Sequence, residues 1–245
     1  MNTANTFKQP IVQSIISAAE EEIYSFKRRT VFAPGTTVNR HIKFCVVAGN
    51  RGAQSQYHTH LGDEIVVTLE GESHNYSGDK EFALKQYQGI AIPPGTEHRT
   101  TVKNIDAWTG ISFYCDDCPL IQKRQPISGA EILKKKIDET PCPTVKKLHK
   151  QSIFSPTLKE THFLELFALS SDIPTSVTHL INKGETVYFS VSGSFSLSWE
   201  NRSVLLRPGM AAAIPAEFTH GLTAEAPNGC KIIGASCSSC PLIPS

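Results

Sequence analysis

The chain has 245 residues, with 24 lysines and arginines against 23 aspartates and glutamates, which leaves a formal net charge of +1. This balance excludes a strong overall field that would attract nucleic acid or an anionic membrane surface, and no apolar run approaches membrane-spanning length, so we expect neither partner. Seven cysteines, an odd number, and the lack of a secretory signal pattern favour a reducing compartment, and we therefore expect a cytoplasmic location.

Residues 1–30 are expected to form a helical leader. Between Pro10 and Arg29, apolar residues recur at the spacing of an amphipathic helix, at Ile11, Ile15, Ile16, Ala19, Ile23 and Phe26. We predict a short helix here that packs against the domain that follows. From Val31 onward, short β-rich runs are separated by Gly, Pro, Asn and Asp, a pattern typical of a sandwich or barrel.

Three histidines and one glutamate in the first half have the spacing of a metal site. His58 and His60 lie two residues apart, so on a strand both side chains point to the same face. Glu64 shares their parity beyond a short turn, and His98 follows the tight turn at residues 93–95. Three imidazoles and one carboxylate suit a divalent transition metal such as Fe, Mn, Ni or Zn, and four protein ligands leave positions open for substrate or oxygen.

This stretch resembles the first motif of the cupin superfamily, G-x5-H-x-H-x3-E-x6-G. Gly52, His58, His60, Glu64 and Gly71 meet it at every spacing. The resemblance implies a jelly-roll β-barrel in which His58, His60, Glu64 and His98 are the metal ligands.

The second cupin motif, G-x5-P-x-G-x2-H-x3-N, is matched in part. Pro93, Gly95 and His98 fit, whereas Tyr87 stands at the glycine position and Val102 at the asparagine position. These departures affect a turn and a supporting position and leave the implied ligands in place.

The second half of the chain repeats the first at a fixed offset of 122 residues. The related pairs include Gly71 and Gly193, His98 and His220, Cys115 and Cys237, and Cys118 and Cys240. We therefore predict an all-β protein with two tandem cupin (jelly-roll type) β-barrels, a bicupin. The expected divisions are a leader over 1–30, a metal-binding barrel over 31–121, a linker with a short helix over 122–150, and a second barrel over 151–245.

The offset places poor metal ligands in the second half, at Leu180, Asn182, Thr186 and His220. A different register would put His179 six residues before Glu185, but it would turn the other side chains of that strand to the opposite face. We therefore expect one metal site, in the first barrel. His220 is expected to be a hydrogen-bonded interior histidine.

The repeated Cys-x-x-Cys pairs have three interpretations. Cys115, Cys118, Cys237 and Cys240 could form one tetrahedral zinc site near the axis that relates the halves. Each pair could instead form a redox-active disulfide, or all four could be reduced cysteines without a function of their own.

Parity also gives candidate residues for a substrate pocket. The residues that share faces with the expected ligands are Gln54, Gln56, Thr68 and Thr100. Three further residues lie on or near expected strands and could face inward: Lys43, His74 and Tyr114. No arginine is expected beside the metal from these strands, which argues against a phosphorylated sugar or an oxalate-like dianion. The pocket should suit a small, mostly apolar molecule with a metal-chelating pair of oxygens.

Three functions remain open. The first is a dioxygenase-type oxidoreductase acting on a small organic substrate that chelates the metal. The second is a non-oxidative metalloenzyme, an isomerase, lyase or hydrolase, on a small organic or sugar-derived substrate. The third is a cupin that binds a small molecule without turnover. In each case the partner is a small molecule, and the chain is expected to be a monomer or a homodimer.

Overall fold

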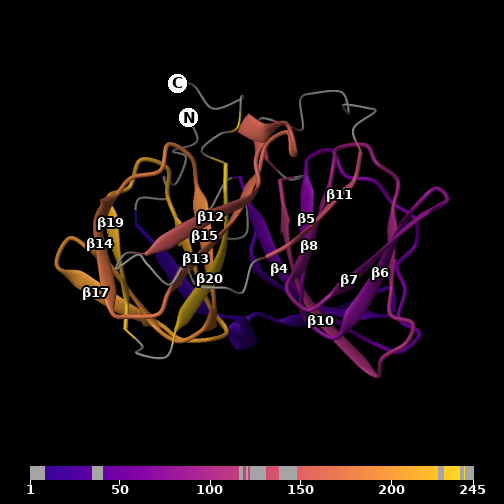
Figure 1. The fold of residues 1–245 in the computed structure, drawn as a ribbon, viewed down its shortest axis with the longest axis horizontal. Helices are drawn as coiled ribbons and strands as arrows, with labels where there is room; N and C mark the ends of the chain where they lie inside the picture. The colour runs from indigo at the N-terminus through magenta and orange to yellow at the C-terminus, as the bar shows by residue number, and fades with distance from the viewer. Residues whose placement is uncertain are drawn as a thin grey trace, which may run out of the picture.

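The computed structural model describes residues 9–34, 41–115, 118–119, 121, 131–137, 148–225, 229–237 and 240. Regular structure in these residues is almost entirely β-strand. The helical segments among them are two short 3-10 helices, η1 (Ile15–Ser17) and η2 (Pro156–Leu158). The fold is therefore all-β, as predicted, and the cupin-like alternation of short strands and turns is present in both halves (Figure 1).

The strands form four sheets. The N-terminal part of the chain supplies β1 (Ile11–Ser14), β2 (Glu20–Ile23), β3 (Phe26–Phe32), β4 (Lys43–Asn50), β5 (Glu64–Glu70), β6 (Glu72–Ser77), β7 (Lys80–Lys85), β8 (Gln88–Ile92), β9 (Arg99–Thr101) and β10 (Ala107–Tyr114). The C-terminal part supplies β11 (Leu133–Lys136), β12 (His149–Phe154), β13 (Glu165–Ser171), β14 (Thr175–Leu180), β15 (Thr186–Ser192), β16 (Phe195–Trp199), β17 (Arg202–Leu206), β18 (Met210–Ile214), β19 (His220–Ala224) and β20 (Cys230–Ser236).

The sheets repeat one arrangement twice. A seven-stranded sheet has the order β11-β8-β5-β10-β4-β3-β2, and a six-stranded sheet has the order β1-β18-β15-β20-β13-β12. A shift of 122 residues converts the first six positions of one order into those of the other, with β2 added at one edge. The smaller sheets, β7-β6-β9 and β14-β19-β16-β17, accompany the larger ones. Figure 1 shows the two sets side by side, one in purple and one in orange.

Each half gives one strand to the large sheet of the other. β1, at the start of the chain, pairs with β18, and Ile11 lies opposite Ala213. β11 pairs with β8, and Leu133 lies opposite Ala91. Both members of one pair are 122 residues from a member of the other pair. The exchange is therefore reciprocal, and backbone hydrogen bonds of the exchanged strands join the two halves.

The expected N-terminal helix is wrong. The triplet at residues 20–22, all glutamate, forms β2 and pairs through the turn at Tyr24 with Lys27, Arg28 and Arg29 of β3. The Nε of Arg28 lies 2.8 Å from Glu21 Oε1, which is one of several cross-strand ion pairs. Three acidic residues opposite three basic ones stabilise a hairpin, and this outweighs the weak helical spacing of the apolar residues.

The expected linker helix is also wrong where the structure describes it. Residues 133–136 form strand β11, because the edge of β8 offers its backbone groups for pairing. Residues 122–130 and 138–147 of the expected linker lie outside the described residues. Since β1 and β11 each belong to the sheet of the opposite half, these described strands of the expected leader and linker are parts of the sheets.

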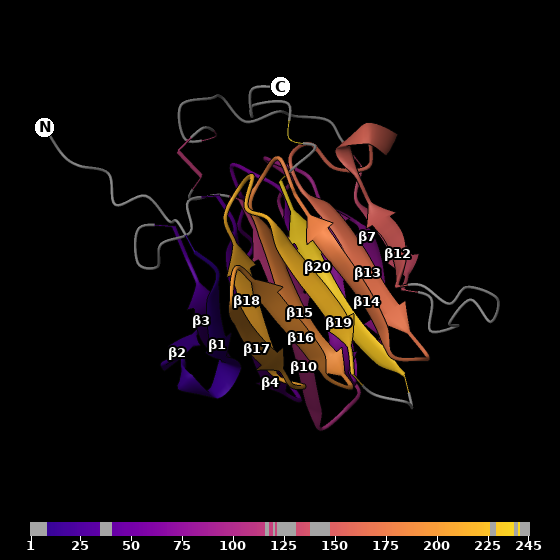
Figure 2. The ribbon, with the colours of Figure 1, turned by 90° about the vertical axis from the view of Figure 1, so that its left-hand side faces the viewer.

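The largest buried cluster lies where the two large sheets face each other. Phe44 of β4 stacks on Phe113 of β10 with ring centroids 5.0 Å apart and also contacts Phe189 of β15 at 5.5 Å. All three are buried, and their cluster includes apolar residues of both halves. The side view in Figure 2 shows the strands of the two halves layered one behind the other. Burial of this shared surface is the main force that holds the halves together.

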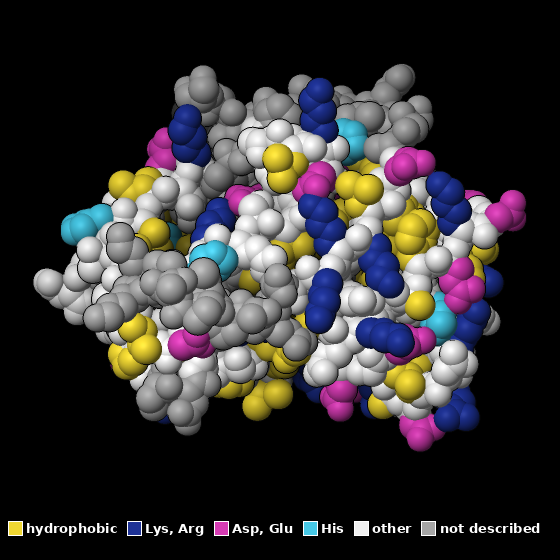
Figure 3. All heavy atoms as spheres, in the orientation of Figure 1, with side chains coloured by type: hydrophobic (Ala, Val, Ile, Leu, Met, Phe, Trp, Pro, Cys, Tyr) yellow, Lys and Arg dark blue, Asp and Glu magenta, His cyan; other side chains and the backbone are white. Residues whose placement is uncertain are grey.

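Smaller apolar clusters fill the space between each large sheet and its smaller partner. In the first half the cluster includes Phe26, Val66, Ile90 and Trp108. On the outside, Figure 3 shows acidic and basic side chains interspersed, with a row of lysine and arginine side chains across the middle of that face. The described residues contain no helix with the length and hydropathy needed to cross a lipid bilayer.

Candidate metal centre

The four implied ligands meet at one point in the first half. Glu64 is the first residue of β5, and His98 directly precedes β9. His58 and His60 lie in the segment that leads into β5. One ligand atom from each residue can be chosen so that all four lie within 4.8 Å of one another.

Backbone hydrogen bonds fix the segments that carry these ligands. His58 and His98 form an isolated β-bridge, in which each N–H donates to the carbonyl of the other at 3.0 and 2.9 Å. The N–H of Gly95 donates to the carbonyl of His60 at 2.7 Å. The tight turn before His98 is therefore tied to the histidine pair, so the ligands are positioned by main-chain contacts before a metal arrives.

The side chains are oriented for coordination. His98 Nε2 lies 2.9 Å and His60 Nε2 lies 3.2 Å from Glu64 Oε2. The Nδ1 atoms of His58 and His98 each lie 2.9 Å from a backbone carbonyl oxygen, of Gln56 and Thr96. With the Nδ1 proton donated to that carbonyl, Nε2 is left as the metal-binding atom, which is the usual arrangement for a histidine ligand.

Electrostatics favour the protonation states that metal binding requires. Burial alone would raise the pKa of Glu64, but the imidazoles of His60 and His98 outweigh it and hold this pKa well below its ordinary value. Burial lowers the pKa of His58. An anionic carboxylate and a neutral imidazole are the ligand forms, so the residues fit a divalent transition metal ion.

The centre opens into a cavity of about 340 Å³. Besides the four ligands its walls are Ile23, Tyr24, Phe26, Arg28, Lys43, Val47, Ser55, Val66, Thr100, Trp108, Ser112 and Tyr114. Arg28 and Lys43 add two cationic groups to an otherwise mostly apolar wall. Arg28 comes from β3, a strand outside the ligand-bearing ones to which the expectation of no arginine was limited.

Tyr114 links the cationic wall to the ligands. Its ring centroid lies 5.2 Å from that of His60, and Lys43 Nζ lies 5.9 Å from the Tyr114 ring centroid. Burial, followed by the nearby charge of Glu64, raises the pKa of Tyr114 well above its ordinary value. The phenol therefore stays protonated near neutral pH and can donate a hydrogen bond into the cavity.

Of the four expected pocket residues, Thr100 lines the cavity. Gln54 and Gln56 are exposed, and Ser55 takes their place at the wall. The reason is a one-residue irregularity. Gln54 pairs with residue 101 and His58 pairs with residue 98. The first segment therefore advances by four residues between the two bridges while the second advances by three. This extra residue reverses the parity between positions 54 and 58.

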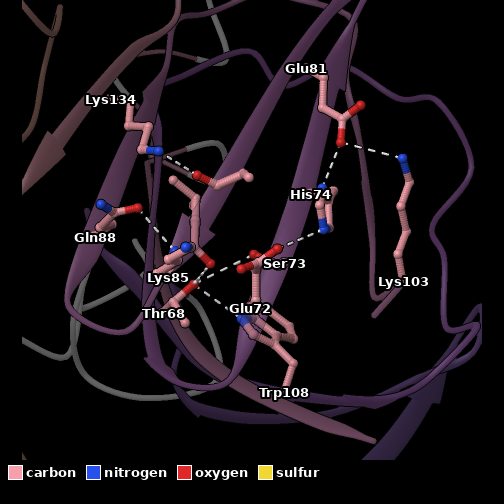
Figure 4. Close-up of polar contacts among 12 residues, drawn as sticks. Thr68, Glu72, Ser73, His74, Glu81, Lys85, Gln88, Lys103, Trp108 and Lys134 are labelled. Atoms are coloured by element: carbon pink, nitrogen blue, oxygen red, sulfur yellow. Dashed lines mark hydrogen bonds and ion pairs between the residues drawn. The ribbon is translucent and has the colours of Figure 1, made fainter. Parts of the chain in front are cut away.

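Thr68 and His74 are absent from the cavity wall and take part in the polar contacts drawn in Figure 4. Thr68 is fully buried, and its hydroxyl accepts a hydrogen bond from Trp108 Nε1 at 3.1 Å, which orients a ring that does line the cavity. The ring nitrogens of His74 lie 3.0 Å from Glu72 and 2.6 Å from Glu81. His74 is therefore held by two carboxylates and is absent from the cavity wall.

The second half has no equivalent cluster of ligands among its described residues. His220 is buried, with Nε2 3.0 Å from the Tyr188 hydroxyl and Nδ1 3.0 Å from the carbonyl of Phe218. A carbonyl can only accept, so Nδ1 of His220 carries the proton and Nε2 accepts from the Tyr188 phenol, whose pKa burial raises to about 12. His179 is exposed and separate from Glu185, which contacts the first half instead.

The unusual residue in the second cupin motif keeps the conformation of the glycine that it replaces. Tyr87 has φ of 56°, and Gly209, 122 residues later, has φ of 81°. Both lie in the left-handed region, which costs a side-chain-bearing residue about 1 kcal/mol. The turn is therefore retained despite the substitution.

The four cysteines of the repeated pairs also come together. Cys115, Cys118, Cys237 and Cys240 are buried, lie outside any disulfide, and border one small cavity.

Arg28 is the charged wall residue that the sequence does not predict. It lies in the segment for which the apolar spacing predicts a helix, and that prediction places no residue of the segment at the site. The useful signal was the acidic triplet at 20–22 followed by the basic triplet at 27–29, which marks a hairpin.

Comparisons with known proteins agree with this architecture. The structure is similar to the putative glyoxylate-induced protein from Pseudomonas aeruginosa, with a TM-score of 0.77, 10% identity, and coverage of 97% of this chain and 92% of that one. It is similar to a variant of oxalate decarboxylase from Bacillus subtilis, with a TM-score of 0.73, 10% identity, and coverage of 95% and 78%. Protein Ylba from E. coli gives a TM-score of 0.71, 12% identity, and coverage of 97% and 95%.

At these identities the structural likeness shows the fold alone. No curated protein matches the chain in sequence. Residues 42–167, just over half of the chain, match the family model described as AraC-like ligand binding domain. This chain therefore belongs to the AraC-like ligand binding domain family, within the cupin superfamily.

Proposed function

We propose that this chain is a metal-dependent enzyme that acts on a small molecule bearing a carboxylate. One divalent ion would be held by His58, His60, Glu64 and His98. The observation that carries the proposal is the position of these ligands at a cavity of about 340 Å³ that also presents cationic side chains. A bound metal would supply Lewis-acid or redox chemistry to a substrate oxygen.

The cationic residues of the wall indicate the substrate class. Arg28 and Lys43 both line the cavity, and a carboxylate accepts charge-assisted hydrogen bonds from such groups. Arg28 Nε is already bound to Glu21, which leaves the outer nitrogens of its guanidinium for a ligand. The substrate would carry a carboxylate and an adjacent oxygen. One of these groups would bind the metal, and the carboxylate would also accept hydrogen bonds from Arg28 and Lys43.

The remaining wall residues have supporting roles. Phe26, Val66 and Trp108 give an apolar surface that limits water around the substrate. Tyr114 would donate a hydrogen bond to a substrate oxygen, because its raised pKa keeps the proton on the phenol. Lys43, beside Tyr114, would bind the substrate carboxylate and so orient the substrate toward the metal.

We propose a dioxygenase-type oxidation as the reaction, because four protein ligands leave room at the ion for both substrate and oxygen. A non-oxidative isomerase, lyase or hydrolase reaction uses the same residues, and the experiment below separates the two. We also infer that each large sheet and its smaller partner form one jelly-roll barrel, with the site in the first barrel and an exchanged strand in each.

The family match supports a second candidate. A domain of the AraC-like ligand-binding type could hold a small carboxylate without converting it. In that case the metal would be part of the binding site, and Arg28 and Lys43 would have the same role in recognition.

The test begins with the metal content of the purified protein. Oxygen consumption and product formation are then measured with a panel of 2-oxo acids, 2-hydroxy acids, enols and catechols. Iron with oxygen uptake that depends on a carboxylate substrate supports the dioxygenase. Manganese or zinc with product formed without oxygen supports the non-oxidative reaction. Saturable binding without turnover supports the second candidate, and a protein that binds no metal at this centre would overturn all three.

A further inference from the structure

Four cysteines from distant parts of the chain border a second cavity, distinct from the one at His58. It has a volume of about 10 Å³, and its lining includes Cys115, Cys118, Cys237 and Cys240 together with His41. A space of this size accommodates one water-sized particle. Two cysteines come from each half, and each cysteine of the first half is 122 residues before one of the second. The cavity therefore lies between equivalent parts of the two halves.

Each cysteine pair is bent by a turn toward this cavity. The N–H of Cys118 donates to the carbonyl of Cys115 at 3.1 Å, and the N–H of Cys240 donates to that of Cys237 at 2.9 Å. The two turns are equivalent under the offset. A Cys-x-x-Cys turn places both sulfurs of a pair on one side, which is the ligand spacing of closed zinc sites.

Polar groups contact the sulfurs of the first pair. The backbone N–H of Asp63 donates to Cys115 Sγ at 3.1 Å. His41 Nδ1 lies 3.2 Å from Cys118 Sγ. The N–H of Asp63 stabilises negative charge on Cys115 Sγ and orients it, as the supporting residues of a metal site do, and His41 does the same for Cys118 in the tautomer that carries its proton on Nδ1. The thiols of Cys115 and Cys237 also donate to the carbonyls of Asp63 at 3.7 Å and Glu185 at 3.5 Å, and they would give up these contacts on binding a metal.

A redox disulfide fits this environment less well. All four side chains are buried, with Cys115 2% and Cys240 7% exposed. Burial, then the nearby charges of Glu185 and Cys240, raises the pKa of Cys237 well above its ordinary value. A thiol that resists ionisation is a poor nucleophile for disulfide exchange, whereas a divalent cation offsets the same cost directly.

We propose that Cys115, Cys118, Cys237 and Cys240 form a structural zinc site that joins the two halves. Binding one Zn²⁺ would release four thiol protons and leave a tetrathiolate centre with a net charge of 2−, partly offset by the N–H groups named above. Among the described residues, the group of ligand atoms already gathered within 4.8 Å is the one around Glu64. The cysteine sulfurs would therefore turn inward by rotation about χ1, the single side-chain torsion that positions the sulfur.

The test uses cobalt as a spectroscopic substitute for zinc. The His60→Ala protein, which lacks the first metal centre, is reduced and titrated with Co²⁺. We expect one equivalent to bind with strong near-ultraviolet sulfur-to-cobalt charge-transfer absorption and tetrahedral visible bands, and Zn²⁺ to displace it. In the same background, the pair Cys118→Ser and Cys240→Ser should lose the absorption. Cys45→Ser, which alters a buried cysteine bonded to Thr30 outside this cavity, should keep it.

The outcomes are separable from those for the proposed enzyme. No charge-transfer absorption in the reduced His60→Ala protein would overturn the zinc site, even if the paired serine variant failed to fold. Fewer than seven titratable thiols in air-oxidised, denatured protein without added metal, combined with no cobalt signal after reduction, would instead indicate disulfides. A rise in Tm of the His60→Ala protein with Zn²⁺, absent in the serine pair, would support the site independently.

Discussion

Asp63 and Glu185 stand 122 residues apart and make the same contact in opposite directions. The Asp63 carboxylate accepts the backbone N–H of Leu164 at 3.0 Å, and the Glu185 carboxylate accepts that of Ile42 at 3.2 Å. Ile42 and Leu164 are also 122 residues apart. Ile42 directly precedes β4, and Leu164 directly precedes β13. Each half therefore supplies a buried acidic cap for the other, in addition to the exchanged strand.

Replacing Asp63 with asparagine should destabilise the protein. The side chain is 1% exposed and also accepts the N–H groups of His162 and Phe163. Asparagine has one acceptor oxygen, and its NH₂ group would face these donors, so we expect the free energy of unfolding to fall by about 2–3 kcal/mol. Urea unfolding measures this change. Asp106→Asn is the control, because that side chain is 94% exposed in its pair with Arg51 and should cost less than about 0.5 kcal/mol. Equal effects of the two substitutions would contradict a special role for Asp63.

Metal content should depend on one half of the chain. His60→Ala removes an imidazole that lies 3.2 Å from Glu64, so the protein should contain one metal equivalent fewer than the unaltered chain. His220→Ala removes an imidazole bonded to Tyr188 and should leave the metal content unchanged. Elemental analysis of the purified proteins gives both numbers. Loss of metal in His220→Ala would show that the second half contributes ligands.

The carboxylate end of the substrate should depend on Lys43. Lys43→Gln removes one cation from the cavity wall without altering the four metal ligands. A charge-assisted hydrogen bond contributes about 1.5–3 kcal/mol, so the Kd of a small carboxylate should rise by about tenfold or more while metal content stays the same. Isothermal titration with the metal-loaded protein measures it. Arg51→Gln changes an exposed cation outside the cavity and should leave the Kd unchanged. Identical Kd values for all three proteins would exclude Lys43 from recognition.

The sequence predicted the parts of this fold that depend on local spacing. The ligand cluster follows from the alternation of His58 and His60 and from two turns with fixed glycine positions, so the expected residues do meet. The repeat is equally local in origin, because each half carries the same turn residues at the same intervals. Gly71 and Gly193, with φ of 77° and 66°, hold equivalent turns.

The errors arose where distant parts of the chain decide the structure. Residues 11–14 and 133–136 are strands because each completes a sheet in the opposite half, and no short-range pattern reports such a partner. The inward position of Ser55 depends on a single unpaired residue between two bridges, which alternation cannot reveal. Arg28 reached the site because its hairpin lies beside the barrel, a placement that also requires knowledge of the tertiary fold.

Substitution of Gly209 should show how much stability is lost when a residue with a side chain occupies this left-handed turn position. Its φ of 81° is unfavourable for any residue with a Cβ, and an added Cβ would meet only ordinary contacts with Ile15. Gly209→Ala should therefore lower the free energy of unfolding by about 1–2 kcal/mol through backbone strain alone. Gly89→Ala places a Cβ at 3.4 Å from Phe154 without a positive φ and should be tolerated better. The reverse order in urea unfolding would show that packing, and not the backbone, decides the effect.

The ion pair between His162 and Asp63 should give stability that depends on pH. His162 Nδ1 lies 3.5 Å from Asp63 Oδ1, and this carboxylate raises the pKa of His162 above its ordinary value of 6.5. A histidine with a raised pKa in the folded state contributes stability that is fully present below the unfolded pKa. That contribution is lost as the pH rises through the higher folded pKa, because the imidazole then gives up its charge in the folded protein as well.

The unaltered protein should therefore exceed His162→Gln in stability by about 0.5 kcal/mol at pH 5.5, and this difference should shrink as the pH approaches 8.5. Urea unfolding at several pH values measures the difference directly. His149→Gln, at an exposed position of β12, serves as the matched control and should show no comparable trend. A difference for His162→Gln that grows with pH would mean that the neutral imidazole, through packing or hydrogen bonding, stabilises the contact between the halves in place of the ion pair.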